Sequence, residues 1–68
     1  MKIEEFSDLG IARVHLNITQ KEMSEALGVP FRTYQNWENH ISNPTSFVKI
    51  EVIAKVQRML DQDEKIKK

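Results

Sequence analysis

The sequence predicts an all-α protein, folded as a compact bundle of four or five helices. Three observations predict it: apolar residues recur at three- and four-residue steps, local start and stop signals divide the chain into short helices, and no cysteine offers a disulfide framework. At 68 residues the chain forms one small domain that buries only roughly 60% of its unfolded surface. It is therefore either a compact helical unit or a subunit stabilised by a partner. We predict a domain over residues 1–60 and a charged, flexible tail over 61–68.

The first helix is predicted from about Glu4 or Phe6 to Leu16. Its apolar residues have the spacing of one helical face. Asn17 is placed to end the helix in a left-handed conformation, which asparagine tolerates better than most residues. The inward residues of this helix are Phe6, Leu9, Ala12 and Leu16.

Two short helices, ITQKEMSEAL and PFRTYQNWEN, are separated only by Gly28 and Val29. Thr19 and Glu22 have the spacing of a capping box, and Gly28 can end the first helix without a Cβ penalty. Pro30 has the fixed φ of a first helical position, which leaves Val29 as an uncapped start. So tight a joint holds the second helix at a steep angle, where its leading turns can enter a DNA groove. The inward residues are Met23, Ala26 and Leu27, then Tyr34 and Trp37.

The last helix is predicted from a cap at Thr45 to about Leu60. It is apolar on two sides, and such a helix in so small a protein must be covered twice. One face should pack on the earlier helices and the other on a second subunit; the alternative is a fifth helix that buries both faces inside one chain. The main face consists of Val48, Val52, Val56 and Met59 with Ile53 and Leu60, and the second patch of Phe47, Ile50 and Ala54.

The net charge is formally zero, whereas nucleic-acid-binding proteins usually carry a basic excess. Acidic residues outnumber basic ones over residues 1–30, basic residues prevail over 31–60, and the two balance over 61–68. The second short helix thus begins a basic section. Its small excess predicts modest, salt-sensitive affinity for DNA per subunit.

Composition and spacing argue against several other classes of protein. There is no cysteine for thiol catalysis or thiolate metal sites, no glycine-rich phosphate loop, and no paired carboxylate at ligand spacing from His15 or His40. We therefore expect no catalysis, no metal and no cofactor. The first residues lack the apolar run of a signal peptide, and no stretch is apolar enough to span a membrane, so we expect a cytoplasmic protein.

Several motifs occur in register along the chain. They are Thr19-Gln20, then Ala26-Leu27-Gly28-Val29, then Tyr34-x-x-Trp37-Glu38-Asn39, and finally Pro44. Together they resemble the phage-repressor (Cro/Xre-like) family of helix-turn-helix DNA-binding proteins over about residues 6–58. The resemblance implies a lambda-repressor-like fold and a homodimer that binds operator DNA.

The resemblance also implies roles for individual residues. Gln20 matches a glutamine that binds a DNA phosphate, aided by the exposed amides and the dipole of the helix start. The outward side of the following helix matches base-reading positions, where Arg can contact guanine, Asn adenine, and Phe a thymine methyl group. The base-reading candidates are Phe31, Arg32, Asn36 and Gln35, and the phosphate-contacting candidates are Gln20, Lys21, Thr33, Asn39, His40 and Asn43.

These roles have structural alternatives. The polar candidates Arg32, Gln35 and Asn36 also fit the solvated face of an amphipathic helix. Phe31 could pack against the preceding helix instead of facing outward, and Gln20 could be a simple polar first-turn residue. The outward orientation of Phe31 is favoured, because Tyr34 and Trp37 already supply the inward stripe of this helix. An exposed aromatic residue there indicates a binding surface.

Arg13 and Glu38 match a pair of family positions that form an ion pair between the first helix and the end of the reading helix. The role implied is structural and orienting. Deleting one partner of a partly buried pair leaves a stranded charge.

The sequence departs from the family pattern at four positions. Pro30 stands where Ser or Thr usually caps the reading helix, and Ser24 replaces a small apolar residue, so that its hydroxyl must bond back to the preceding turn. His40 replaces a glycine and must adopt a turn conformation at a Cβ cost. Tyr34 is larger than the usual Val or Ile, and we expect its hydroxyl to reach solvent or phosphate.

We predict a sequence-specific transcriptional regulator, a Cro/Xre-like repressor that reads a palindromic operator in double-stranded DNA. The helix over about 30–39 would enter the major groove, once from each subunit of a homodimer. The alternative is an antitoxin or protein-interaction module with the same fold, which neutralises a toxin-like partner through the apolar patch or the charged tail. The near-neutral charge favours this alternative, whereas Gln20, Phe31 and Arg32 favour DNA.

Overall fold

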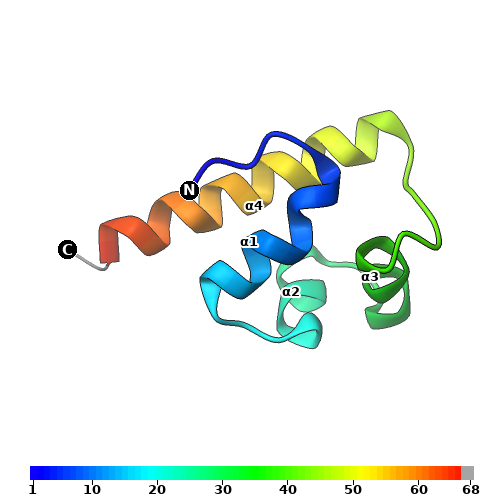
Figure 1. Ribbon diagram of the computed structural model, residues 1–68, viewed down its shortest axis with the longest axis horizontal. Coiled ribbons are helices and arrows are strands. Elements are labelled where there is room, and N and C mark those ends of the chain that lie inside the picture. Colours follow the sequence, from blue (N-terminus) through cyan, green and yellow to red (C-terminus); the bar gives the residue numbers. More distant parts are fainter. Residues whose placement is uncertain (67–68) are drawn as a thin grey trace.

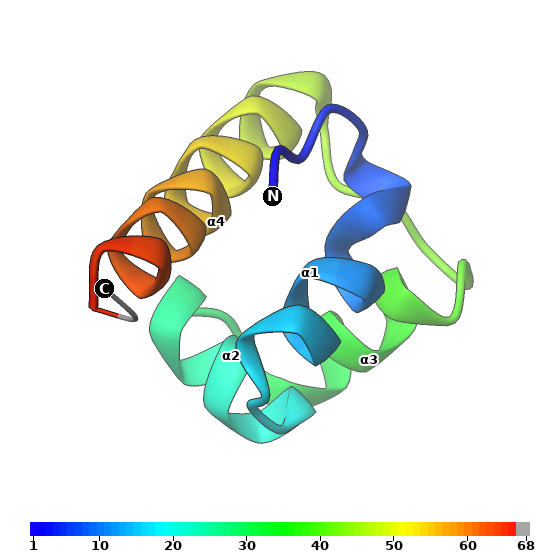
Figure 2. The ribbon, with the colours of Figure 1, turned by 60° about the vertical axis from the view of Figure 1, so that its left-hand side comes forward.

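A computed structural model describes residues 1–66 of the chain (Figure 1). One 3-10 turn and four α-helices make up this part, and it contains no strand. The long helix α4 runs the length of the molecule; α1 and α2 pack against one side of it, and α3 packs against α2 on that same side (Figure 2). The predicted all-α class is confirmed. The elements are η1 (Phe6–Asp8), α1 (Leu9–Leu16), α2 (Gln20–Leu27), α3 (Phe31–Glu38) and α4 (Ser46–Ile66).

The predicted first helix is divided into η1 and α1. Asp8 lies at the junction with ψ near 1°, away from α-helical values, and the Asp8 amide donates to the Glu5 carbonyl at 3.0 Å. The Asp8 carboxylate accepts from the Glu5 amide at 3.3 Å, which holds this tight turn. At the other end Asn17 has φ 59°, so the predicted left-handed stop is confirmed.

The local signals around α2 are confirmed. The Glu22 amide donates to Thr19 Oγ1 at 3.1 Å, and the Thr19 amide donates to Glu22 Oε1 at 2.8 Å, which completes the capping box. Gly28 ends α2 with φ 73°. The predicted start of α3 at Pro30 is wrong by one residue, since Pro30 is the extended residue before the helix, and its carbonyl accepts the amide of Tyr34.

The core lies between α4 and the three short helices. Tyr34 and Trp37 are buried as predicted, and Trp37 meets Phe6 edge to face with ring centroids 5.3 Å apart. The prediction for Ala26 is wrong, because Ala26 is exposed and Ser24 is buried in α2 instead. As expected, the Ser24 hydroxyl donates back to the preceding turn. The buried apolar residues are Ile3, Leu9, Ala12, Met23, Leu27, Tyr34, Trp37, Val52, Val56 and Leu60.

Helix α4 begins as predicted but ends later. The Val48 amide donates to Thr45 Oγ1 at 3.4 Å, which confirms the cap at Thr45. The predicted end at about Leu60 is wrong, because the helix continues to Ile66. Residues 61–66 of the predicted flexible tail are therefore helical, and residues 67–68 lie outside the described part. Within this extension Asp61 accepts from the Gln57 side chain one turn earlier, at 3.0 Å.

The two faces of α4 differ as the sequence predicts. Val52, Val56 and Leu60 are buried, whereas Phe47 is 71% and Ile50 68% exposed. The described chain forms no fifth helix over the exposed face. Residues 1–4, which we call the N-terminal strap, instead run beside α4, and Ile3 inserts into the core (Figure 2). No helix among residues 1–66 is long and apolar enough to cross a membrane.

Candidate nucleic-acid interface

The joint between α2 and α3 is set by the backbone. The amides of Gly28 and Val29 donate to carbonyls of the last turn of α2, at 3.2 and 3.0 Å. A Cβ at Gly28 would meet no atom within 4 Å, so the left-handed φ of 73°, and not lack of space, is what favours glycine there. This turn fixes the direction in which α3 leaves α2.

Glu38, at the end of α3, is tied to α1 by an ion pair. Arg13 Nε lies 2.7 Å from Glu38 Oε2, and the two side chains are only 20% and 11% exposed. Arg13 Nη1 also donates to the Ile18 carbonyl at 2.8 Å, just before α2 begins. A Cβ on Gly10 would lie 3.4 Å from Glu38 Oε1, within van der Waals contact, so the carboxylate lies close against α1 at this position.

The same carboxylate also holds the first residue of α2. Gln20 Nε2 donates to Glu38 Oε1 at 3.1 Å, and Gln35 Nε2 donates to Gln20 Oε1 at 3.4 Å. We call these four residues, Arg13, Gln20, Gln35 and Glu38, the Glu38 network. It connects α1, the start of α2, and α3 through side chains alone.

The pKa values reflect this environment. Burial raises the pKa of Glu38, but Arg13, Tyr34 and Gln20 beside the carboxylate lower it, and the net pKa lies below the usual value. The hydrogen bond to Glu38 raises the pKa of Arg13. Both groups therefore carry their charges at neutral pH.

The expectation for the Tyr34 hydroxyl is wrong. Tyr34 is completely buried, and among the described residues its hydroxyl makes no hydrogen bond of normal geometry, although Glu38 and Arg13 lie close to it. Burial raises the pKa of Tyr34 well above the usual value, and the Glu38 carboxylate raises it further. The hydroxyl faces the ion pair because α3 turns this position toward α1, so it reaches neither solvent nor a phosphate.

The exposed side of α3 begins at its first turn. Phe31 is 43% exposed and Arg32 is exposed, while Asn36 is half-buried one turn later. Phe31 therefore does not bury itself against α2. No side chain caps the start of α3, because Pro30 occupies the capping position. An aromatic ring, a guanidinium group and uncapped helix amides thus lie together at one helix end.

The other phosphate-contacting candidates lie on α2, on α3 and in the loop after α3. His40 has φ 60°, the turn conformation that the sequence predicts, and the carbonyl of Asn36 accepts the Ile41 amide at 2.9 Å. Lys21 is exposed on the first turn of α2, and Thr33 is half-buried on α3. The remaining exposed candidates, which follow α3, are Asn39, His40 and Asn43.

Sequence reasoning missed the hydrogen bonds from Gln35 to Gln20 and from Gln20 to Glu38. The sequence contains one signal for the site of the network, since a glycine inside a helix often marks a close approach by another group. Gly10 is that glycine. The partner pairs themselves are 15 and 18 residues apart, and no local pattern connects them.

The fold and this surface define a class: a small helical protein with a helix-turn-helix, whose second helix is exposed at its leading turn. A sequence model of the family described as helix-turn-helix matches residues 9–61. The chain belongs to this family, in its Cro/Xre-like branch, whose members are DNA-binding regulators and not enzymes. Searches among curated proteins and among solved structures found no match.

Proposed function

We propose that the protein is a repressor that binds a palindromic operator as a homodimer. Each subunit inserts α3 into the major groove, and the two copies occupy grooves one helical turn apart, about 34 Å. Occupation of the operator blocks transcription. The observation that carries the proposal is the exposed, uncapped start of α3, with Phe31 and Arg32 next to the turn that fixes the helix.

Base reading falls to the outward residues of α3. Arg32 can donate a fork of hydrogen bonds to guanine, Asn36 can bridge N6 and N7 of adenine, and Phe31 can lie against a thymine methyl group. Gln35 already donates to Gln20, and a carboxamide has a second hydrogen for a base edge. Gln35 thus both reads DNA and connects the reading helix to α2.

Phosphate contacts fall to Gln20 and the residues around it. Gln20 stands at the first position of α2, where the amides and the helix dipole favour an anion. One hydrogen of its Nε2 goes to Glu38, which leaves the other for a phosphate oxygen. The additional phosphate contacts are those of Lys21, Thr33, Asn39, His40 and Asn43.

The experiment is fluorescence anisotropy with labelled DNA from upstream of the gene itself and with a shuffled duplex of the same composition. Each titration is run at low and at moderate salt. We expect the upstream DNA to bind more tightly, and affinity for both to fall with salt, because phosphate contacts release counterions. Equal binding to the two duplexes, or none, would contradict operator recognition.

A second candidate function rests on the exposed apolar face of α4. Phe47 and Ile50 are large, more than two-thirds exposed, and on the same helix face, a surface suited to a protein partner. In this case the protein neutralises a toxin-like partner as an antitoxin. A small toxin-like reading frame beside the gene, and a stable complex of the two purified products, would distinguish this function from operator binding alone.

A further inference from the structure

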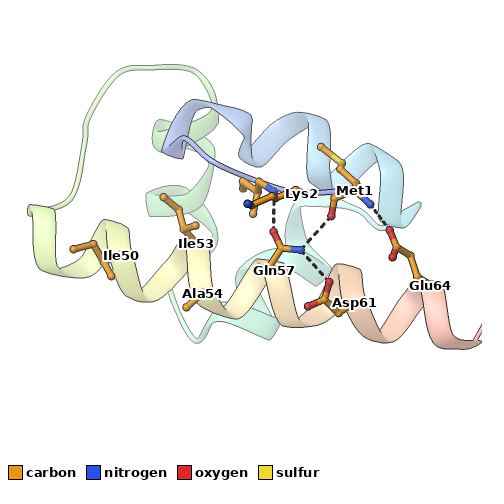
Figure 3. Close-up of a pocket in the computed structure, with 9 residues that line it drawn as sticks. Met1, Lys2, Ile50, Ile53, Ala54, Gln57, Asp61 and Glu64 are labelled. Atoms are coloured by element: carbon orange, nitrogen blue, oxygen red, sulfur yellow. Dashed lines mark hydrogen bonds and ion pairs between the residues drawn. The ribbon is translucent and has the colours of Figure 1, made fainter.

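Gln57 of α4 holds the N-terminal strap through two hydrogen bonds that match those of a neighbouring β-strand. The Ile3 amide donates to Gln57 Oε1 at 2.8 Å, and Gln57 Nε2 donates to the Met1 carbonyl at 3.1 Å (Figure 3). A residue in a parallel strand makes this same pair of bonds to positions i and i+2 of its neighbour. Residues 1–3 are therefore paired along one edge, the edge facing Gln57.

The opposite edge of the strap is open. In extended backbone the polar groups of successive residues point to alternate edges, so the groups of Lys2 and Glu4 point away from Gln57. Their amides and carbonyls make no hydrogen bond to any part of the described chain. Both side chains are exposed, whereas Ile3 between them is buried. An unpaired edge of this kind is a template for another strand.

We propose that this edge binds the strap of a second copy as an antiparallel strand, with the two-fold axis at Ile3. Lys2 of each copy then lies opposite Glu4 of the other, in the hydrogen-bonded type of pair. Each of the two pairs exchanges two main-chain hydrogen bonds and brings opposite charges together.

Two properties of the strap identify the partner strand and its register. They are the charges of Lys2 and Glu4, and the alternation of main-chain polar groups between its two edges. The open groups belong to even-numbered residues, so antiparallel registers that use them pair even positions with even positions. Centring the axis at Lys2 or at Glu4 places like charges opposite each other, which destabilises a strand pair. Centring it at Ile3 pairs Lys2 with Glu4 twice. The edge is thus complementary to itself in one register.

An open groove lies along the edge of the strap that faces Gln57, on the side away from the proposed partner strand. The strap forms one wall of this groove, and Ile50, Ile53 and Ala54 of α4 form the other (Figure 3). Isolated two-stranded pairs are marginal in water, so we expect this contact to be weak. The inference rests on the proposed homodimer in that it names the surface that joins the subunits.

Charge reversal provides the first test, by analytical ultracentrifugation of the full chain without DNA at low salt. Lys2→Glu and Glu4→Lys should each weaken self-association by about tenfold, because each makes two attractive pairs repulsive. The double variant Lys2→Glu/Glu4→Lys should restore the parent value. A control double variant, Lys55→Glu/Glu25→Lys, has the same net charge and should associate like the parent.

Disulfide trapping provides the second test, and the absence of cysteine from the chain makes it clean. Opposite residues of a hydrogen-bonded pair have Cα atoms about 5.5 Å apart, within disulfide reach, whereas diagonal neighbours lie about 7–8 Å apart. A mixture of Lys2→Cys and Glu4→Cys should therefore cross-link faster than either variant alone.

The outcomes separate this inference from the proposed function. A dimer unaffected by either charge reversal, or equal cross-linking in the mixture and in each variant alone, would show a different subunit surface and overturn the strap pairing while leaving the homodimer. A monomeric parent chain would overturn the strap pairing and the homodimer together. Operator binding is measured separately, since neither Lys2 nor Glu4 belongs to the proposed DNA-contacting set.

Discussion

Two regions of the molecule differ in how their side chains are paired or covered: the region of α1, α2 and α3 around Glu38, and the outer side of α4. Around Glu38, charged and amide side chains from three helices bond to one another in a largely buried network. On the outer side of α4, Phe47 and Ile50 remain in solvent. In the first region the side chains bond within one chain, and in the second large apolar side chains stay exposed. A hydrogen-bonded network beside the proposed reading helix and an exposed apolar face thus occur on one small fold.

The largest expected effect is the loss of Glu38. Glu38→Ala leaves the Arg13 guanidinium, which is only 20% exposed, without its partner and frees Gln20, so we expect a loss of about 3 kcal/mol in unfolding free energy. Urea unfolding followed by circular dichroism measures it. Glu25→Ala, at an exposed position of α2, is the matched control and should stay within about 0.5 kcal/mol of the parent. Similar stability of the two variants would show that the network contributes little.

The next effect concerns the reading surface. Arg32→Ala should weaken binding to the operator by about 1–3 kcal/mol and relax base preference, because a base-edge contact is lost. Gln20→Ala should weaken binding to all sequences alike, as a phosphate contact would. Anisotropy titrations with specific and shuffled duplexes compare them, and Lys55→Ala on α4 is the control. If both variants bind as the parent does, α3 is not the reading helix.

A smaller effect should appear with pH. Folding lowers the pKa of Glu38, so the stabilisation from its ionised form is complete above the usual carboxyl value of 4.5 and is lost as the pH falls through the lower folded value. Unfolding midpoints measured from pH 7 downward should show this loss. Glu38→Gln has no such carboxylate, and its stability should change less over the same acidic range. A parallel decline in parent and variant would assign the effect to other carboxyl groups.

The smallest effect on stability is expected on the outer side of α4. Ile50→Ser changes a side chain that is 68% exposed, so the unfolding free energy should stay within about 0.5 kcal/mol of the parent. Binding of a toxin-like partner, the second candidate function, should weaken if that partner covers this apolar face. Sedimentation together with urea unfolding separates the two quantities. A large loss of stability would show that this face is already packed within one chain.

The sequence alone determines the local geometry of this protein. The capping box at Thr19 and the left-handed stops at Asn17 and Gly28 all follow from residues within four positions of one another. Short-range sterics and side-chain to backbone bonds decide them, so the pattern can be read without the fold. The family resemblance adds the helix-turn-helix arrangement and the turn at His40.

Only the tertiary structure decides which distant side chains meet. Gln20 and Gln35 bond because the turn at Gly28 brings α2 and α3 together, and Glu38 bonds both to Arg13 of α1 and to Gln20 of α2. Gln57 fastens residues 1–3 from more than fifty positions away. These hydrogen bonds form only after the apolar faces have packed, because packing sets the distances between helices that local propensity leaves free.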